Sequence, residues 1–250
     1  MPPSSSSQIP SEHLILALEA SGDAVSVAVM QNNLCTSFKE HRARFGHAEH
    51  LVGLVSEALA ESGAEFQDIT HIAAGCGPGS FTGLRVCLSA AKGYALATNA
   101  RPIGVNGLAA LALHTISDRP SAPEPSGPVI CFADTRRQSV FAQMFDGLGQ
   151  ASSSVFDLPF DQITVFFDEI YKRYDGHDVF LCGLTDQLSD NLSGLIPPSD
   201  KLTVLQTAAD AKIIAAYAVQ SLAALDKFPH TDFSPLYVVT PNLGSGKRQA

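Results

Sequence analysis

Basic residues are scarce in this sequence of 250 residues. Lys and Arg number 16 against 25 Asp and Glu, so the formal net charge is −9 at pH 7. A protein that binds nucleic acid strongly by itself usually carries a basic patch. No long basic run is present, and the pair Lys247-Arg248 near the end is short. We therefore expect no strong direct contact with nucleic acid.

Cysteine pairs and long apolar runs are also missing. The five cysteines form no CxxC motif, and four lie in apolar runs, which favours buried, reduced thiols and a cytoplasmic protein. No run of 18 apolar residues occurs, so we expect no membrane span. The first 11 residues lack the basic start and apolar centre of a signal peptide, and we expect residues 1–12 to be disordered. The cysteines are Cys35, Cys76, Cys87, Cys131 and Cys182.

One glycine-rich stretch organises the first half of the chain. It follows the apolar run His71–Gly75 and precedes a long helical pattern that ends near Thr98, which predicts strand, tight turn and helix. Either Ser80 or Thr82 is a suitable helix cap. The amides at such a helix start can bind an anion, or the turn can simply pack a crossover closely against a sheet. The loop residues are Gly77, Pro78, Gly79, Ser80, Phe81, Thr82 and Gly83.

The first half begins with three strand patterns and continues with alternating helices and strands. Apolar runs and valines at alternate positions predict a three-strand meander. Apolar residues at helical spacing predict the helices. The predicted strands cover 14–19, 24–30, 34–39, 71–75 and 101–105, and the predicted helices cover 47–62, the stretch after Gly83 to about Thr98, and 107–116.

The second half repeats the opening unit. Val129–Asp134 is again an apolar strand that ends in an acid, and a turn and a second strand, Ser139–Phe145, follow. Glu19 therefore corresponds to Asp134, and the two lie about 115 residues apart, which indicates two halves with one plan. Further patterns predict a helix within 158–173, strands at 178–183 and 201–205, a helix at 208–225 and an extended segment at 235–239.

This order of elements is typical of an α/β protein with two ribonuclease-H-like halves of the actin/sugar-kinase/Hsp70 type, each a mixed sheet flanked by helices. Residues 117–128 contain four prolines and read as a linker. We expect a disordered N-terminus at 1–12, a first domain at 13–116, the linker at 117–128, a second domain at 129–240 and a tail at 241–250.

Few residues suggest a catalytic, metal-binding or phosphate-binding site. His47 and His50 are three apart on one helix, but a metal site needs further ligands, so a helix-start or interface role is the favoured interpretation. Gly244-Ser245-Gly246-Lys247 lacks the remaining P-loop residues, and no nucleophile elbow is present. We expect no catalytic residue, no metal and no cofactor.

The acids Glu19 and Asp134, each at the end of the first strand of its half, allow two interpretations. In phosphotransferases of this fold class such acids hold magnesium or orient a water near phosphate. The alternative, which we favour, is that each carboxylate closes the strand end through hydrogen bonds to turn amides.

The string GxGPGSFTGLRV, here Gly75 to Val86, resembles the signature of the TsaB (YeaZ) family. The resemblance covers residues 13–116 well and thins in the second half to Asp134-Thr135-Arg136 and Pro235-Leu236-Tyr237. It implies a non-catalytic scaffold subunit of the tRNA N6-threonylcarbamoyladenosine (t6A) machinery that modifies A37. The implied partners are TsaD directly, the ATPase TsaE through the complex, tRNA only indirectly, and a second copy of the chain when TsaD is absent. A small-molecule kinase of the same fold class and a metallopeptidase are the alternatives.

Two helices of the first half are too apolar for ordinary surface helices. The helix pattern after Gly83 carries only Arg85 and Lys92 as charges before Ala100, and the pattern at 47–62 is similarly apolar. One face of each can cover the sheet, and a partner is the simplest cover for the rest. We predict a partner interface that includes His47, His50, Leu51, Leu54, Val55, Arg85, Val86, Ser89, Ala90, Gly93 and Ala97.

Overall fold

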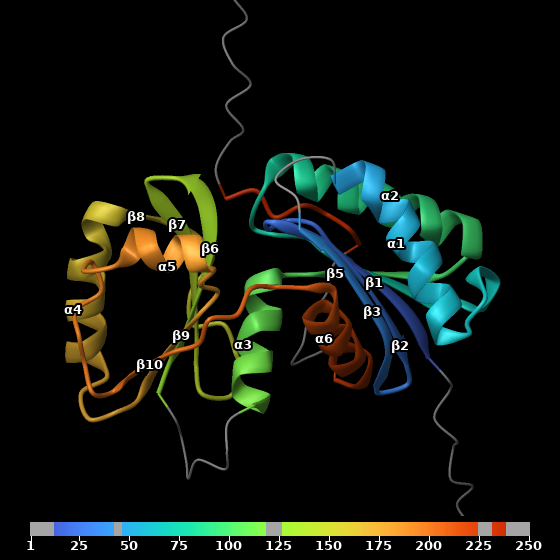
Figure 1. Cartoon of the computed structure of the whole chain (residues 1–250). Helices are drawn as coiled ribbons and strands as arrows, with labels where there is room; N and C mark the ends of the chain where they lie inside the picture. Colours follow the sequence, from blue (N-terminus) through green and yellow to red (C-terminus); the bar gives the residue numbers. More distant parts are fainter. Residues whose placement is uncertain (1–12, 43–46, 119–126, 225–231, 239–250) are drawn as a thin grey trace, which may run out of the picture.

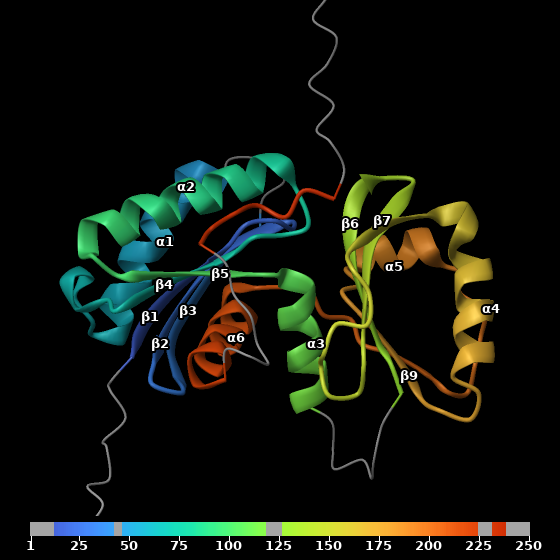
Figure 2. The same ribbon diagram turned by 180° about the vertical axis from the view of Figure 1, so that it is seen from behind.

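The computed structural model describes residues 13–42, 47–118, 127–224 and 232–238, which form two mixed five-stranded sheets flanked by helices (Figures 1 and 2). The N-terminus predicted at 1–12, most of the predicted linker and the predicted tail at 241–250 lie outside the described residues. The division of the chain into domains stays a prediction.

The first sheet has the strand order β3-β2-β1-β4-β5. β1, β2 and β3 pair antiparallel, which confirms the predicted meander, and β4 and β5 continue the sheet parallel to β1. The central strands are apolar on both faces because helices cover both faces. The strands are β1 (Leu14–Glu19), β2 (Ala24–Gln31), β3 (Leu34–Arg42), β4 (His71–Gly75) and β5 (Arg101–Val105).

The second sheet repeats this plan. Its order is β10-β9-β6-β7-β8, in which the hairpin β6–β7 corresponds to β1–β2 and the parallel strands β9 and β10 correspond to β4 and β5. The predicted fold class, two ribonuclease-H-like halves, is confirmed by this shared order. The strands are β6 (Val129–Arg137), β7 (Ser139–Phe145), β8 (Phe156–Pro159), β9 (Val179–Cys182) and β10 (Leu202–Val204).

The helices stack with the sheets in layers. α1 and α2 cover the outer face of the first sheet, α6 covers its inner face, α3 lies between α6 and the second sheet, and α4 and α5 cover the far face (Figures 1 and 2). The helices are α1 (His47–Ser62), α2 (Phe81–Thr98), α3 (Gly107–Ser117), α4 (Ile163–Arg173), α5 (Asp186–Leu192) and α6 (Ala211–Ala223).

Two of these helices cross the predicted domain boundary. α3 belongs to the stretch 13–116 yet contacts β6, β7 and β9 of the second sheet. α6 belongs to the stretch 129–240 yet contacts β1, β2 and β4 of the first sheet. Each half thus places its last predicted helix against the sheet of the other half.

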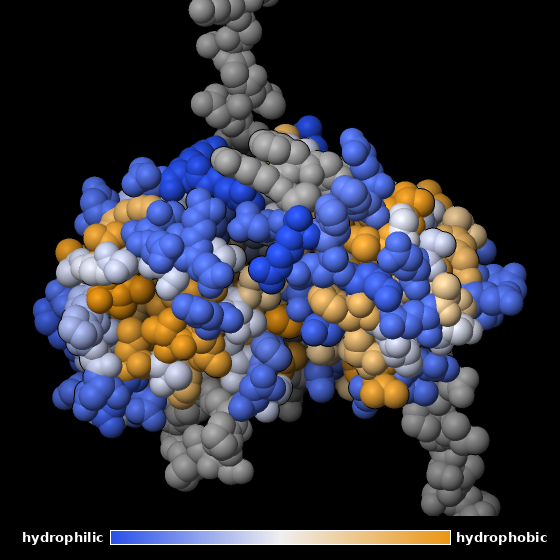
Figure 3. All heavy atoms as spheres, in the orientation of Figure 1, coloured by the Kyte–Doolittle hydropathy of each residue, from blue (hydrophilic) through white to orange (hydrophobic). Residues whose placement is uncertain are grey.

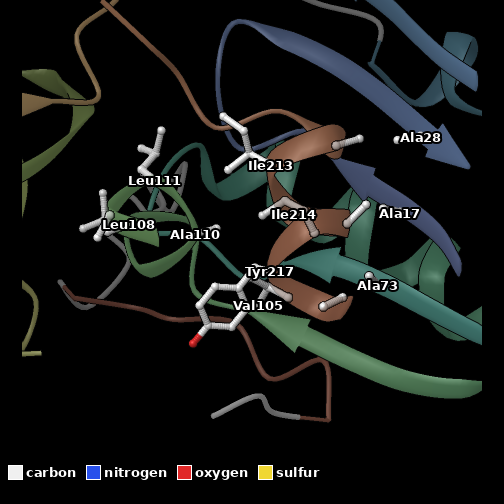
Figure 4. Close-up of a cluster of buried hydrophobic side chains, with 14 of the residues drawn as sticks. Ala17, Ala28, Ala73, Val105, Leu108, Ala110, Leu111, Ile213, Ile214 and Tyr217 are labelled. Carbon is white, nitrogen blue, oxygen red and sulfur yellow. The ribbon is translucent and has the colours of Figure 1, made fainter. Parts of the chain in front are cut away.

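One apolar core consequently spans both halves. Ile214 of α6 and Leu108 of α3 lie in the same buried cluster as Ala17 of the first sheet and Cys131 of the second (Figure 4 shows the part around α3 and α6). Separating the two sheets would expose this cluster to water, so the hydrophobic effect holds them together. Four of the five cysteines are buried as thiols, as predicted, and burial raises the pKa of the Cys87 and Cys131 thiols.

Side-chain caps fix where several helices begin. Ser80 accepts a hydrogen bond from the Gly83 amide at the start of α2, Asn106 accepts one from Leu108 at the start of α3, and Asp210 accepts one from Ile213 at the start of α6. Of the two predicted caps of α2, Ser80 is therefore the one that is used.

Candidate functional site

The glycine loop between β4 and α2 is bound on several sides by other parts of the chain. The Cys76 amide donates to the Val105 carbonyl at 2.7 Å, and the Ser80 amide donates to the Ser21 carbonyl at 2.8 Å. The Gly77 carbonyl accepts from Gly107 at 2.9 Å. The Cys76, Ser80 and Gly83 amides thus have partners within the chain, and these hydrogen bonds hold the loop against the β1–β2 turn and the start of α3.

Gly79 and Gly83 are required for close approach. A side chain on Gly83 would overlap the Ala20 carbonyl oxygen, and one on Gly79 would press on Ser21. Gly83 is the third residue of α2 and does not have a left-handed backbone conformation. The chain therefore needs a glycine at this position for space and not for its backbone angles. The loop and the β1–β2 turn therefore lie in direct backbone contact.

The strand-end acids both bind turn amides. Glu19, only 1% exposed, accepts a hydrogen bond from the Ser21 amide at 2.5 Å, and Asp134 accepts one from the Arg136 amide at 2.7 Å. The same contact to the second following residue thus occurs in each half. This geometry agrees with the structural interpretation of these acids.

The second carboxylate oxygen of Glu19 is buried without a hydrogen-bond partner. Burial raises the pKa of Glu19 above its ordinary 4.5, against the opposing effect of the hydrogen bonds from Ser21 and Ala20. The folded state therefore holds a proton on Glu19 at pH values where the unfolded chain has released it. Stability from this group is complete below about pH 4.5 and falls as the pH rises through the folded pKa.

We accordingly expect Glu19→Gln to be more stable than the wild-type chain at pH 8 and to lose this advantage toward pH 4. Glutamine keeps the acceptor for the Ser21 amide and removes the charge that burial penalises. Urea unfolding between pH 4 and pH 8 measures the difference, with Glu57→Gln on the exposed side of α1 as the control. A difference between the two chains that stays constant with pH would refute the raised pKa.

A cavity of about 500 Å³ lies between the two halves. The β1–β2 turn, the β6–β7 turn and the starts of α3 and α6 border it, and Leu108, Leu111 and Phe132 supply apolar lining. Arg136 reaches across the cavity mouth and forms an ion pair with Asp23 and a 3.3 Å hydrogen bond to the Gly22 carbonyl. The cavity thus lies where the β1–β2 turn of the first half faces the β6–β7 turn of the second half.

The charge of this cavity opposes anions. Five carboxylates and two guanidinium groups line it. Arg42 pairs with Glu40 at 2.7 Å, and Arg136 pairs with Asp23. Three carboxylates are left in excess, so a phosphate group would meet net repulsion. The acids in excess are Asp134, Asp186 and Asp210.

Of the two helix histidines, only His50 has a described side chain. The His50 ring stacks on His41 of β3, with ring centroids 3.7 Å apart, and the side chain of His47 lies outside the described residues. Among the described side chains, no group of three His, Cys, Asp or Glu residues is close enough to hold a metal ion. His50 therefore links α1 to β3.

The predicted partner interface divides between core and surface. Leu51 and Val55 are buried under α1, so they contact the sheet and cannot face a partner, which corrects that part of the prediction. Two large exposed side chains were missed, Val52 at 65% and Leu96 at 82% exposure. Of the other predicted positions, Leu54, Val86 and Ala90 are half-buried, and Arg85, Ser89, Gly93 and Ala97 are exposed.

The exposed positions on α1 and α2 form what we call the α1–α2 face. The two helices lie side by side on the first sheet, and Figure 3 shows apolar side chains scattered among polar ones over this side of the molecule. The exposed residues recur at spacings of three and four, as on the solvent-facing side of any helix. They include Gly53, Ser56 and Ala60 on α1 and Arg85, Ser89, Lys92 and Leu96 on α2.

Gly53 and Gly93 lie in the middle of these helices with open space around them. A side chain added to either would meet nothing within 4 Å. Glycine inside a helix costs about 1 kcal/mol relative to alanine, and neither the fold nor the backbone conformation requires it here. Exposed glycines of this kind let another helix approach closely.

Known proteins resemble this chain in sequence. A family model described as "TsaD: tRNA N6-adenosine threonylcarbamoyltransferase" matches residues 40–174. A Buchnera aphidicola protein described as "tRNA threonylcarbamoyladenosine biosynthesis protein TsaB" is 30% identical over 103 residues, 41% of this chain and 46% of that protein. A Streptococcus pneumoniae "tRNA N6-adenosine threonylcarbamoyltransferase" is 40% identical over 114 residues, 39% of this chain and 34% of that protein. The chain thus matches less than half the length of these relatives.

A solved structure from Pseudomonas aeruginosa, described as similar to peptidase YeaZ, has a TM-score of 0.71 at 22% identity and covers 91% of this chain and 100% of that one. Likeness at this identity shows the fold alone.

The two sheets of equal strand order define a two-lobed α/β protein of the actin/sugar-kinase/Hsp70 class. The chain belongs to the family of the matching model, TsaD: tRNA N6-adenosine threonylcarbamoyltransferase, since the match covers more than half of its residues. The relative described as TsaB confirms the resemblance that the glycine loop indicated. No helix in the described part of the chain has the length and apolar character needed to cross a bilayer.

Proposed function

We propose that this chain is a non-catalytic scaffold subunit of the machinery that makes t6A at A37 of tRNA, and that it binds and supports TsaD. Family membership and the TsaB relative support a place in this pathway. TsaE joins through the complex, tRNA is contacted only indirectly, and the protein works in the cytoplasm. The acidic chain, at −9, fits a subunit that leaves tRNA binding to its partner.

The α1–α2 face is the observation that carries this proposal. Its exposed Gly53 and Gly93 have no role within the chain, and Val52 and Leu96 present apolar surface beside them. A helix pair of TsaD, which shares the family, fits against this face as a pseudo-symmetric partner. A second copy of this chain uses the same face when TsaD is absent, closed by two-fold symmetry.

The transferase activity itself is a second candidate, because the family model and the Streptococcus pneumoniae relative carry that description. The described side chains offer no metal-binding group of three, and the cavity between the halves carries excess negative charge. We therefore propose that this chain is a partner of the transferase and not the transferase itself.

We expect the purified chain to neither hydrolyse ATP nor modify tRNA, and to raise the amount of t6A formed when it is added to TsaD, TsaE and threonylcarbamoyl-adenylate. Nucleoside analysis of the tRNA by mass spectrometry measures the product, and phosphate release measures hydrolysis. Turnover by the chain alone that follows it through purification and disappears in Glu19→Ala would contradict the proposed role.

A further inference from the structure

The segment formed by residues 232–238 returns to the first half after α6. Phe233 is 2% exposed and lies in the apolar core beneath α1 and α2. The Leu236 amide donates a hydrogen bond to the Cys76 carbonyl at 2.8 Å, so the segment lies along the loop that precedes α2 (Figures 1 and 2). The segment is thus anchored in the first half close to the start of the α1–α2 face.

Three side chains meet where this segment reaches α2, and we call them the aromatic–arginine cluster: Phe81, Arg85 and Tyr237. The Tyr237 ring lies 5.6 Å from the Phe81 ring, and the Arg85 guanidinium lies 3.8 Å from the centre of Phe81. Tyr237 is 45% exposed and Arg85 is exposed. Arg85 is also one of the exposed residues of α2, so the cluster adjoins the α1–α2 face.

The cluster has the composition of a binding anchor. Tyrosine and arginine are enriched among the residues that carry most of the energy of protein interfaces. Stacking on Phe81 restricts the Arg85 side chain, so less conformational entropy is lost when a partner binds it. Among the described residues Arg85 has no ion pair, so its guanidinium is available for a carboxylate.

Charge identifies the kind of partner. α2 carries no acidic residue, and its only charged side chains, Arg85 and Lys92, are both exposed. The exposed acids of the α1–α2 face, Glu49, Glu57 and Glu61, all lie on α1, so Arg85 at the start of α2 is a local positive charge that can attract a carboxylate. We propose that the aromatic–arginine cluster anchors one end of the TsaD contact, where a TsaD carboxylate binds Arg85 and an apolar side chain packs on Tyr237. This inference rests on the proposed function.

The test is the affinity for TsaD of the same organism, measured by calorimetry with the full chain. We expect Arg85→Ala and Tyr237→Ala each to weaken binding about 10-fold or more, as for interface anchors. Arg85→Lys keeps the charge and loses the stacked, forked geometry, so it restores part of the affinity. Arg101→Ala, an exposed arginine at the start of β5, is the matched control and stays within about twofold, as expected for a residue outside the contact.

Circular dichroism checks that each variant is folded. The Gly93→Glu variant distinguishes failure of the aromatic–arginine cluster as an anchor from failure of the α1–α2 face as the TsaD interface. If Gly93→Glu abolishes TsaD binding while Arg85→Ala and Tyr237→Ala bind normally, the cluster is not an anchor and the proposed function stands. If all three bind normally, the proposed face itself is wrong. Loss of self-association alone, with TsaD binding unchanged, would assign the cluster to a second copy and overturn the inference.

Discussion

Gly93→Glu should weaken the association of this chain with TsaD by roughly 100-fold or more while leaving the isolated chain folded. Position 93 is exposed in the middle of α2 and has open space around it, so the free chain accepts the new side chain. In the proposed complex a partner helix packs closely at this glycine. The glutamate would then be buried without a partner charge, which is costly.

Val165→Glu is the matched control for this experiment. Val165 is an exposed apolar residue on α4 of the second half, remote from the α1–α2 face in Figures 1 and 2. The control variant should bind TsaD and self-associate like the wild-type chain. Normal TsaD binding and normal self-association of Gly93→Glu would show that the interface lies elsewhere.

Gly83→Ala should destabilise the chain by about 1–3 kcal/mol, because overpacking at a close contact forces the backbone to move. The added methyl group would overlap the Ala20 carbonyl oxygen at the point where α2 meets the β1–β2 turn. Neither atom belongs to a flexible side-chain end, so the strain cannot be relieved by a rotamer change. Urea unfolding at constant pH measures the loss.

Gly93→Ala on the same helix should have the opposite effect on the stability of the chain. Its methyl group meets open space, and replacing a mid-helix glycine with alanine should stabilise the isolated chain by about 1 kcal/mol. The same variant should bind TsaD less tightly if a helix packs there. A Gly83→Ala chain as stable as Gly93→Ala would contradict the close contact between the loop and Ala20.

Most of the fold could be predicted because its strands are continuous apolar runs and its helices begin at recognisable residues. The apolar strand that ends at Glu19 recurs as the strand that ends at Asp134, and this repeat predicted a second half with the same plan. The short strand β8 and the seven-residue helix α5 were missed, since Phe156–Pro159 and Asp186–Leu192 carry too few residues to show a period. The exchange of α3 and α6 between the halves depends on tertiary packing that no local pattern encodes.

The candidate interface was predicted less well for a definite reason. α1 and α2 are apolar around most of their circumference, so the sequence does not reveal which side faces the sheet. Leu51 and Val55 were placed on the surface and lie in the core, whereas Val52 and Leu96 were left out and are exposed. The partnership of Tyr237 with Phe81 joins residues more than 150 positions apart, which sequence spacing cannot show.

The most direct test of the central claim is light scattering coupled to gel filtration, applied to this chain mixed with TsaD of the same organism. We expect a complex with one copy of each protein to form at about 10 μM, a concentration at which an interface of micromolar or better affinity is populated. The chain alone should elute as a concentration-dependent dimer. Separate elution of the two proteins at that concentration would contradict the proposed role as the TsaD partner.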